Sequence, residues 1–300
     1  MKIFTEFPLE KIDYKTIFTA GVFDGIHLGH KKLLDVFNNT AESEKLNRAL
    51  LTFTDSPKII SADNKNQVQE FKILQDEIKL KELEKWTDML FLIDFKNIAH
   101  FSPEFFLEEI LIKKLNVSRI IAGYDFRFGK EKKGGYELLE EKLPGKITLV
   151  SPLEIDGEIV SSSLIRKYLS ENNIDRANKF LGKEFSITGK VQRGKRLATS
   201  LGFPTVNLIY PNNIIDLSGI FKSSVLFDGK RYASISHFGV VPTFNSNERI
   251  IETYIFDFNK EIYGQEITVF PAEFLRPIIK FNSIDELKKQ IIIDINNIVK

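Results

Sequence analysis

The sequence predicts two domains: an α/β domain with a parallel sheet, then a small antiparallel β-barrel domain with a C-terminal helix. The first observation is the length, because 300 residues at roughly 150 per domain give two domains. Up to about residue 180, short apolar runs alternate with segments of helical period, which is typical of βα units. From about Phe185, β-branched and aromatic residues alternate between Gly, Pro and Asn, which is typical of a small barrel or sandwich.

Five apolar runs in the first half predict buried strands of the parallel sheet. Most of them are too apolar to have one face in water, so we expect helices on both faces and a three-layer domain. The expected strands are Thr16–Phe23, Ala49–Thr54, Met89–Asp94, Arg119–Gly123 and Lys146–Ser151.

Local signals mark two of the helices between these strands. Glu70–Trp86 carries charges at nearly every turn and apolar residues along one side. Ser102 followed by Pro103 indicates the N-cap and the first position of a helix that runs through Leu115. The polar stretch Ser56–Gln69 is expected to be a mobile loop.

The second half of the chain predicts several strands and a closing helix. Ser283 and Glu286 form a capping box ahead of an apolar helical stripe. The change of pattern puts the domain boundary near Gly182, with domains at 1–183 and 184–300. The strands with the clearest alternation are Lys222–Phe227, Arg231–Ser236 and Glu252–Phe258.

The composition narrows the class of protein. The 42 Lys and Arg against 41 Asp and Glu give a net charge of +1, and the chain has no basic arm, so nucleic-acid binding has no support. The absence of cysteine excludes disulfide frameworks and thiolate nucleophiles. The N-terminal residues do not resemble a signal peptide, and no apolar run approaches the ~18 residues of a membrane span. We therefore expect a soluble cytoplasmic protein with neither nucleic-acid nor membrane partners. The sequence does not determine its oligomeric state.

Residues 19–30 read TAGVFDGIHLGH, a strand followed by a glycine-rich turn and two histidines. His27 and His30 are three residues apart, so at a helix start both imidazoles can face one ligand. Glycines let backbone N–H groups approach closely, and a helix N-terminus favours anions. After the first strand of an α/β domain, this combination favours a nucleotide phosphate.

This segment has three other interpretations. A capped helix start with two surface histidines would need no ligand. A zinc site would need a third protein ligand, such as His100 or His237, which nothing in the sequence brings near. An ordinary P-loop is disfavoured because the segment lacks Gly-Lys-Ser/Thr.

Two further segments of the first half could bind a nucleotide. Residues 160–166 read VSSSLIR, in which Ser162 or Ser163 can cap a helix and Arg166 then lies one turn later on the same face. Residues 122–129 read AGYDFRFG, in which Asp125 and Arg127 lie between two glycines. Alone, the first would be a plain N-cap and the second a strand end followed by a turn.

Together these segments resemble a known superfamily. GxFDGxHxGH resembles the HxGH signature of nucleotidyltransferases, VSSSLIR is similar to their ISSTxIR element, and AGYDFRFG resembles the GxDFRFG segment of bacterial FAD synthetases. The resemblance implies a Rossmann-like domain in which His27 and His30 stabilise the α-phosphate of a nucleoside triphosphate as pyrophosphate leaves. It implies ATP- or phosphate-binding roles for Gly21, Phe23, Asp24, Gly29, Asp125, Arg127, Ser162, Ser163 and Arg166.

The second half carries another motif, GKVQRGKRLATSLGFPTVNL at residues 189–208. By composition its GFPTVN is a turn that leads into a strand. It resembles the riboflavin kinase signature ending in LGFPTAN, which implies that Thr205 and Asn207 bind Mg²⁺ and that Gly194 and Lys195 bind ATP phosphates. Residues 252–258, ETYIFDF, are similar to a later segment of that family whose Glu is the base, here Glu252.

The two motif sets together are identified as those of bifunctional bacterial riboflavin kinase/FMN adenylyltransferases. This family membership implies that riboflavin and ATP give FMN, and that FMN and ATP give FAD and pyrophosphate, with Mg²⁺ as cofactor. Two alternatives stay open: a nucleotidyltransferase with another acceptor, and a non-catalytic flavin or nucleotide sensor.

The kinase half departs from its family's pattern at several positions. Ala198 and Thr199 stand where a Gly-Arg pair is usual, and His237 stands in place of Asn. Val241 replaces an Arg, and Pro277 replaces an acidic residue. Because Ala lacks the backbone freedom of Gly and Thr cannot replace a guanidinium, an impaired kinase is a further hypothesis.

Overall fold

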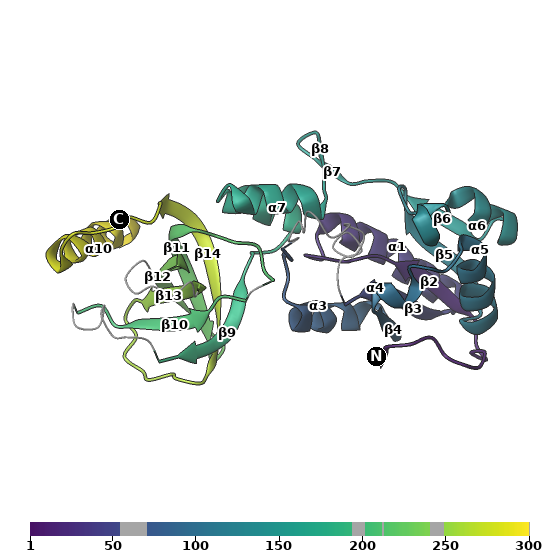
Figure 1. Ribbon diagram of the computed structural model, residues 1–300, viewed down its shortest axis with the longest axis horizontal. Helices are drawn as coiled ribbons and strands as arrows, with labels where there is room; N and C mark the ends of the chain where they lie inside the picture. The colour runs from purple at the N-terminus through teal and green to yellow at the C-terminus, as the bar shows by residue number, and fades with distance from the viewer. Residues whose placement is uncertain (55–70, 194–201, 212, 241–248, 300) are drawn as a thin grey trace. The chain divides into compact units, whose positions relative to one another are not determined.

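The computed structural model describes residues 1–54, 71–193, 202–211, 213–240 and 249–299 (Figure 1). The chain forms two compact units, unit 1 at Met1–Ser162 and unit 2 at Ser163–Lys300. The predicted domain division at 183/184 stays a prediction. The predicted loop Ser56–Gln69 lies outside the described residues. No described helix offers a stretch long and apolar enough to cross a lipid bilayer.

Unit 1 is built on a six-stranded sheet, and all of its strand pairs are parallel. The five predicted strands are confirmed, and the short edge strand β1 was not predicted. The order is β1-β4-β3-β2-β5-β6. The strands are β1 (Lys2–Phe4), β2 (Thr16–Ala20), β3 (Asn47–Phe53), β4 (Met89–Ile93), β5 (Val117–Gly123) and β6 (Ile147–Val150).

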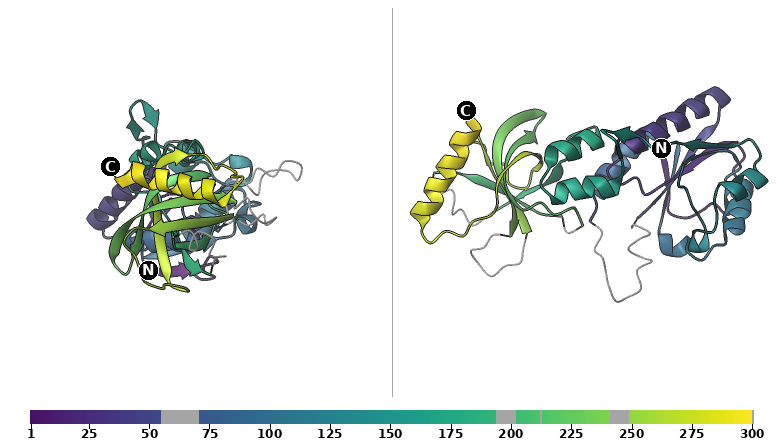
Figure 2. Two further views of the ribbon diagram at one scale, coloured as in Figure 1. Left: turned by 90° about the vertical axis from the view of Figure 1, so that its left-hand side faces the viewer. Right: turned by 90° about the horizontal axis from the view of Figure 1, so that it is seen from above.

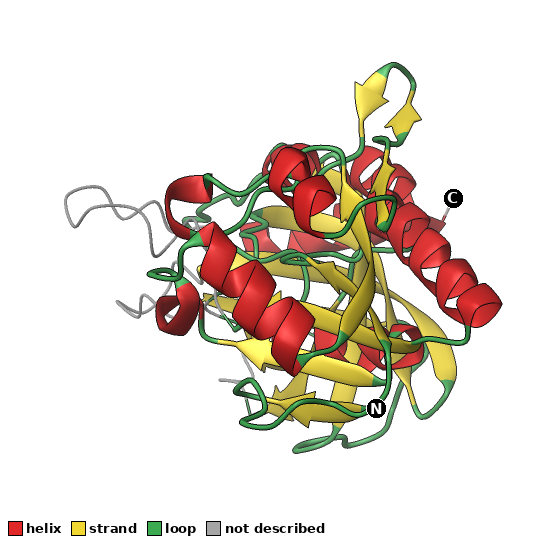
Figure 3. Ribbon diagram, turned by 90° about the vertical axis from the view of Figure 1, so that its right-hand side faces the viewer, coloured by secondary structure: helices red, strands yellow, loops and turns green. Residues whose placement is uncertain are grey.

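Helices cover both faces of this sheet, as the apolar strands predict (Figure 3). Successive strand residues point to opposite faces, so Ile17 packs with α1 (Leu28–Glu44) and α3 (Asp76–Leu83), whereas Phe18 packs with η2 (Phe106–Lys114). The remaining elements of unit 1 are short: η1 (Glu84–Trp86), α4 (Phe95–Ile98), α5 (Pro103–Phe105), η3 (Lys130–Lys132), α6 (Tyr136–Lys142), β7 (Glu154–Ile155) and β8 (Glu158–Ile159).

Two of the predicted helices differ from the structure at their ends or in their winding. Ser102 caps its helix as predicted, because its hydroxyl accepts the Phe105 N–H, but the helix continues as a π-helix in η2. The helix expected from Glu70 begins at Asp76 in the structure.

Unit 2 contains a closed barrel in the order β10-β13-β12-β11-β14-β9, so the barrel alternative is confirmed over the sandwich. All six strand pairs are antiparallel. The elements are α7 (Ser162–Ser170, whose first residue belongs to unit 1), α8 (Ile174–Leu181), β9 (Ile187–Gln192), β10 (Thr205–Ile209), β11 (Gly219–Phe227), β12 (Lys230–Val240), β13 (Arg249–Ile255), β14 (Glu266–Arg276) and α10 (Ile284–Val299).

Alternation along the barrel strands separates an interior from an exterior face. Ser223, Ser234, Ser236 and Thr253 are buried, and their hydroxyls are linked by hydrogen bonds of 2.7–2.8 Å. Glu252, the strand neighbour of Thr253, is only partly buried and faces the other way. The predicted kinase residue Glu252 therefore lies on the outer face of the barrel.

The closing helix α10 lies outside the barrel strands (Figure 2). Ser283 accepts the Glu286 N–H as predicted, but the Glu286 carboxylate accepts from Asn282 N–H rather than from the cap residue. Arg276 on β14 holds the helix through a bidentate pair with the buried carboxylate of Asp294, at 2.7–3.1 Å.

Candidate active sites

The first candidate site lies at the carboxyl ends of β2 and β5. Between these two strands, the direction in which the chain adds strands to the sheet reverses. From β2 the chain goes to β3 on one side, and it returns to β5 on the other side. Phe18 pairs with Ile120, so Gly21 and Gly123 follow at the same level. In open α/β sheets ligands bind at such a switch point. The topology therefore brings the loop with the two histidines next to the loop with Asp125.

The loop between β2 and α1 has an unusual backbone. Phe23, Gly25 and Ile26 all have positive φ, at 51°, 82° and 43°. Phe23 therefore leaves the strand in which it was predicted, and its buried ring lies 3.2 Å from where a Cβ at Gly21 would be. Non-glycine residues in this conformation cost free energy and persist where the surroundings hold them, often at functional sites.

His27 and His30 come together at the start of α1. His27 is the N-cap, and its Nδ1 accepts the His30 N–H at 3.3 Å. A neutral His27 thus carries its proton on Nε2, which can donate to a phosphate. The two rings are stacked, with centroids 3.7 Å apart and planes 16° apart. A Cβ at Gly29 would lie 3.2 Å from the Val160 carbonyl oxygen, so this position has little space for a side chain.

The Asp24 carboxylate accepts hydrogen bonds from backbone N–H groups in the protein interior. It is 4 % exposed and accepts the N–H groups of Ile73 and Leu74 at 2.9–3.2 Å. The Asp24 carbonyl accepts the Ser162 hydroxyl at 2.9 Å. These contacts join the loop between β2 and α1 to the residues just before α3 and to Ser162, so Asp24 helps to hold that loop in place. Its predicted contact with ATP stays a prediction.

Replacing Asp24 by Ala should destabilise the protein, because two buried N–H groups lose their acceptor. We expect the free energy of unfolding to fall by about 2–3 kcal/mol in urea denaturation. Asp35 lies exposed on α1, and Asp35→Ala is the matched control with little expected change. Equal unfolding free energies for the two variants would contradict this role of Asp24.

The Asp125 loop is exposed and stands on a well-packed base. Arg127 Nη1 donates to the Phe126 carbonyl at 3.1 Å, and both Asp125 and Arg127 face solvent. Beneath them, Phe128 is buried and stacked on Phe126. Gly129 has φ +71°, and a Cβ there would lie 2.7 Å from Pro103. The loop is therefore rigid at its base while its polar groups are accessible.

The serine-arginine segment lies where the two compact units divide. Ser162 begins α7 and belongs to unit 1, whereas Ser163 and Arg166 belong to unit 2. Arg166 is one helical turn after Ser162, as predicted, but both serines lie inside the helix, so neither is the predicted N-cap, a position that falls on Ser161. Its predicted contact with the triphosphate stays a prediction.

The second candidate site lies on the outer face of the barrel, where three neighbouring strands meet. The Thr205 hydroxyl donates to Glu252 Oε1 at 2.8 Å. Glu252 pairs directly with Asn207 on β10 and with His237 on β12. Directly paired residues have Cβ atoms about 5 Å apart on one face. The strand register thus gathers Thr205, Asn207 and Glu252, although 47 residues separate Thr205 from Glu252.

His237, which stands in place of the family's Asn, lies beside this group in a desolvated position. Burial, with a smaller contribution from the nearby positive charge of Arg276, lowers the pKa of His237 to about 4. Among the described residues, none forms a hydrogen bond with Nε2 of His237. The imidazole is therefore neutral at pH 7.

His237 should make the protein less stable in acid. Its pKa in the folded state lies below the unfolded value of about 6.5, so the unfolded state binds the proton more tightly. Stability is lost as the pH falls from about 6.5 to about 4, by up to about 3 kcal/mol. Urea denaturation gives the free energy of unfolding of wild type and of His237→Asn at pH 7 and at pH 4. We expect the difference between the two proteins to change by this amount from pH 7 to pH 4. A difference that is the same at both pH values would contradict it.

Several predicted positions lie outside the described residues, namely Gly194, Lys195, Ala198, Thr199 and Val241. Pro277 is described and exposed, and its carbonyl accepts from Arg276 Nη1.

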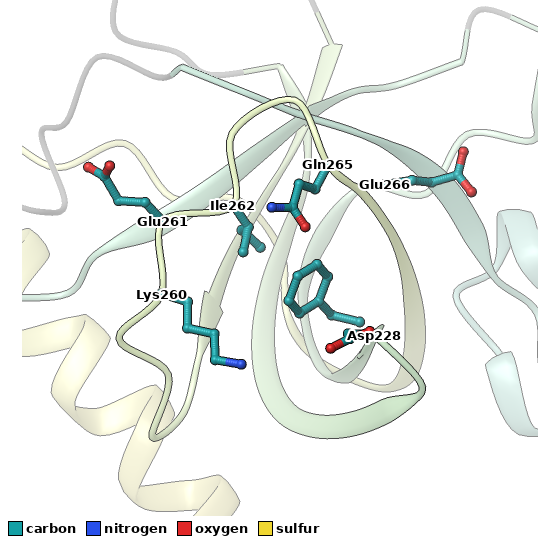
Figure 4. A pocket seen from close by; sticks show the side chains of 7 residues that line it. Asp228, Lys260, Glu261, Ile262, Gln265 and Glu266 are labelled. Carbon is teal, nitrogen blue, oxygen red and sulfur yellow. The ribbon is translucent and has the colours of Figure 1, made fainter.

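A cleft of about 510 Å³ lies at the end of the barrel that is remote from His237 (Figure 4). Phe227, which lines it, is seven residues along β11 from Ile220, the residue paired with His237. The side chains of Glu261 and Glu266 point away from each other in Figure 4. The cleft contains none of the predicted site residues, and it is lined by Phe227, Asp228, Lys260, Glu261, Ile262, Gln265 and Glu266.

Comparisons with known proteins match a different family model to each half of the chain. A family model described as FAD synthetase matches residues 9–164, and one described as riboflavin kinase matches residues 181–300. A protein of Buchnera aphidicola from Schizaphis graminum, named bifunctional riboflavin kinase/FMN adenylyltransferase, is 35% identical and aligns over 97% of this chain and 96% of its own. A protein of the same name from Bacillus subtilis is 33% identical over 92% of this chain and 89% of its own.

A solved structure extends the likeness to the whole fold. It comes from Streptococcus pneumoniae and is described as a macrolide-efflux protein. It is 30% identical, covers 98% of this chain and 97% of its own, and superposes with a TM-score of 0.86. Because both family models and the curated relatives agree in order along nearly the entire sequence, this chain belongs to the bifunctional riboflavin kinase/FMN adenylyltransferase family.

Proposed function

We propose that this protein makes FAD in two ATP-dependent steps. Unit 2 transfers the γ-phosphate of ATP to riboflavin and gives FMN and ADP. Unit 1 transfers the adenylyl group of a second ATP to FMN and gives FAD and pyrophosphate. The observation that carries the proposal is that each half holds its own polar group, His27 with His30 in unit 1 and Thr205 with Glu252 in unit 2. The two family matches cover these same halves.

In the adenylyl transfer, a phosphate oxygen of FMN attacks the α-phosphorus of ATP, and the bond to pyrophosphate breaks. Negative charge develops on the α-phosphate and on the leaving group. His27 Nε2–H and the N-terminus of α1 stabilise that charge, and His30 lies against the His27 ring. We assign phosphate contacts to the backbone of Gly21 and Gly29, as the motif implies. We assign nucleotide contacts to Asp125, Arg127, Ser162, Ser163 and Arg166, as the motifs imply.

In the kinase reaction, Glu252 accepts the proton of the riboflavin 5′-hydroxyl as that oxygen attacks the γ-phosphate. The Thr205 hydroxyl donates to the Glu252 carboxylate and so orients it. Thr205 and Asn207 fit a magnesium ion, because a hydroxyl that donates elsewhere still has lone pairs and an amide oxygen is a hard ligand. The ion supplies neutralisation of phosphate charge when bound. Gly194 and Lys195 are assigned to ATP phosphates.

The proposed ligands are small molecules: riboflavin, FMN and ATP with Mg²⁺. The proposed location is the cytoplasm, because ATP is abundant there and the cysteine-free chain needs no oxidising compartment.

The decisive test is to incubate the full chain with Mg²⁺, ATP and either riboflavin or FMN, and to separate the flavins by chromatography. We expect FMN to give FAD and riboflavin to give both FMN and FAD. If FMN reacts and riboflavin does not, the kinase half of the proposal fails, and Ala198 and Thr199 are the first substitutions to revert. If neither flavin reacts, the whole proposal fails.

A further inference from the structure

A buried lysine contacts the loop between β2 and α1. Lys79 on α3 is 5 % exposed, whereas Lys81, two residues later on the same helix, is exposed. The ammonium of Lys79 donates to the Phe53 carbonyl at 3.0 Å, to Thr52 Oγ1 at 3.3 Å and to the Val22 carbonyl at 3.4 Å. It therefore contacts the end of β3 and the loop that follows β2 at the same time.

These acceptors connect Lys79 to the strained part of the site. Val22 lies between Gly21 and Phe23, the residue with φ 51°. Its carbonyl also accepts the hydroxyl of the fully buried Thr52 at 3.1 Å. Two donors from different elements thus fix one peptide oxygen of the loop, five residues before His27. A loop that holds left-handed non-glycine residues needs such external support.

The charge of Lys79 suits this position. Burying an ammonium group is costly, so a lysine in an amphipathic helix normally extends into water, as Lys81 does. Lys79 instead lies at the carboxyl ends of β2 and β3, the edge of the sheet at which open α/β domains bind their ligands.

We propose that Lys79 is a positioning residue for the adenylyl transfer. Its ammonium holds the Val22 and Phe53 carbonyls and so fixes the loop that presents His27. This inference rests on the proposed adenylyl transfer at His27 and His30.

The first test compares Lys79→Met with Lys81→Met in the full chain. For Lys79→Met we expect the kcat of FAD formation from FMN to fall about 10- to 100-fold, as for a misplaced catalytic group. The KM for ATP should change less than about threefold, and FMN formation from riboflavin by the same preparation should stay unchanged. Lys81→Met should resemble wild type in both reactions.

A second test asks whether the ammonium itself is required. The chain has no cysteine, so Lys79→Cys has a single thiol. Alkylation with 2-bromoethylamine in denaturant, followed by refolding, adds a side chain that ends in an ammonium at nearly the length of lysine. Alkylation with iodoacetamide adds a neutral amide. We expect the first product to regain most of the kcat and the second to stay near Lys79→Met, with wild type taken through the same cycle as reference.

The outcomes separate this inference from the proposed function. If wild type makes FAD and Lys79→Met matches its kcat, the positioning role is wrong. If both alkylated products regain activity equally, the charge is not needed and the proposal is overturned. If wild type makes no FAD from FMN, the proposed adenylyl transfer fails first. A KM for ATP in FAD formation within threefold of wild type, together with an unchanged circular dichroism spectrum, shows that unit 1 of the variants, which contains Lys79, is folded.

Discussion

His27→Asn is expected to lower the kcat of FAD formation from FMN by about 10²- to 10³-fold, as when a donor to a developing anion is removed. Asn is as good an N-cap as any residue, so the start of α1 keeps its side-chain acceptor for the His30 N–H. The variant therefore removes the imidazole donor while the helix start is retained. Chromatographic measurement of FAD against time gives the rate.

Two comparisons make this result specific. His100→Asn changes an exposed histidine of the same unit, and we expect wild-type rates. Riboflavin phosphorylation by His27→Asn should be unchanged, because that reaction is assigned to unit 2. The assignment of His27 would be lost if His27→Asn made FAD at the wild-type rate.

The sequence predicts those features of unit 1 that depend on neighbouring residues, and it misses those that depend on residues far apart in the chain. Continuous apolar runs are a local signal of buried strands, so the five strands β2 to β6 were found. The β1 strand was missed because it has only three residues, Lys2–Phe4, and gains its place by pairing with β4. The π-helix η2 was missed because its apolar pattern does not distinguish one helix type from another.

The site of unit 1 shows the same limit more clearly. The spacing of His27 and His30 is local, so their meeting at a helix start could be predicted. The partners of Asp24 lie 49 and 50 residues away along the chain, and no pattern near Asp24 indicates them. Lys79 gave no signal at all, because in the sequence it is one charge among many on a polar helix.

In unit 2 the barrel could be predicted and the site could not. Alternation along Lys222–Phe227 fixes which residues share a face, but it does not fix which strand is the neighbour. Glu252 has no local feature that distinguishes it from a solvated carboxylate. Only the register, which pairs it with Asn207 and His237, brings the group together. The family resemblance supplied what the residues alone could not.

Glu252→Gln should lower the kcat of riboflavin phosphorylation by about 10²- to 10⁴-fold, the range for losing a general base. The amide keeps the size of the side chain and its oxygen can still accept from the Thr205 hydroxyl. It cannot accept the proton of the ribityl hydroxyl, so the defect is one of chemistry rather than of folding. FMN formation is measured by chromatography at saturating riboflavin and ATP.

Glu266→Gln is the matched control, since Glu266 is an exposed carboxylate on another strand of the same barrel. It should leave the rate unchanged, and Glu252→Gln should still convert FMN to FAD.

Two variants at Thr205 distinguish the orientation of Glu252 from proton transfer by Glu252. Thr205→Ser keeps the hydroxyl that donates to Glu252, whereas Thr205→Val removes it. We expect Thr205→Ser to stay within a few fold of wild type and Thr205→Val to lose most activity, because the carboxylate loses its donor and Mg²⁺ loses a proposed ligand. A Glu252→Gln variant with the wild-type kcat would exclude Glu252 as the base, whatever Thr205 does.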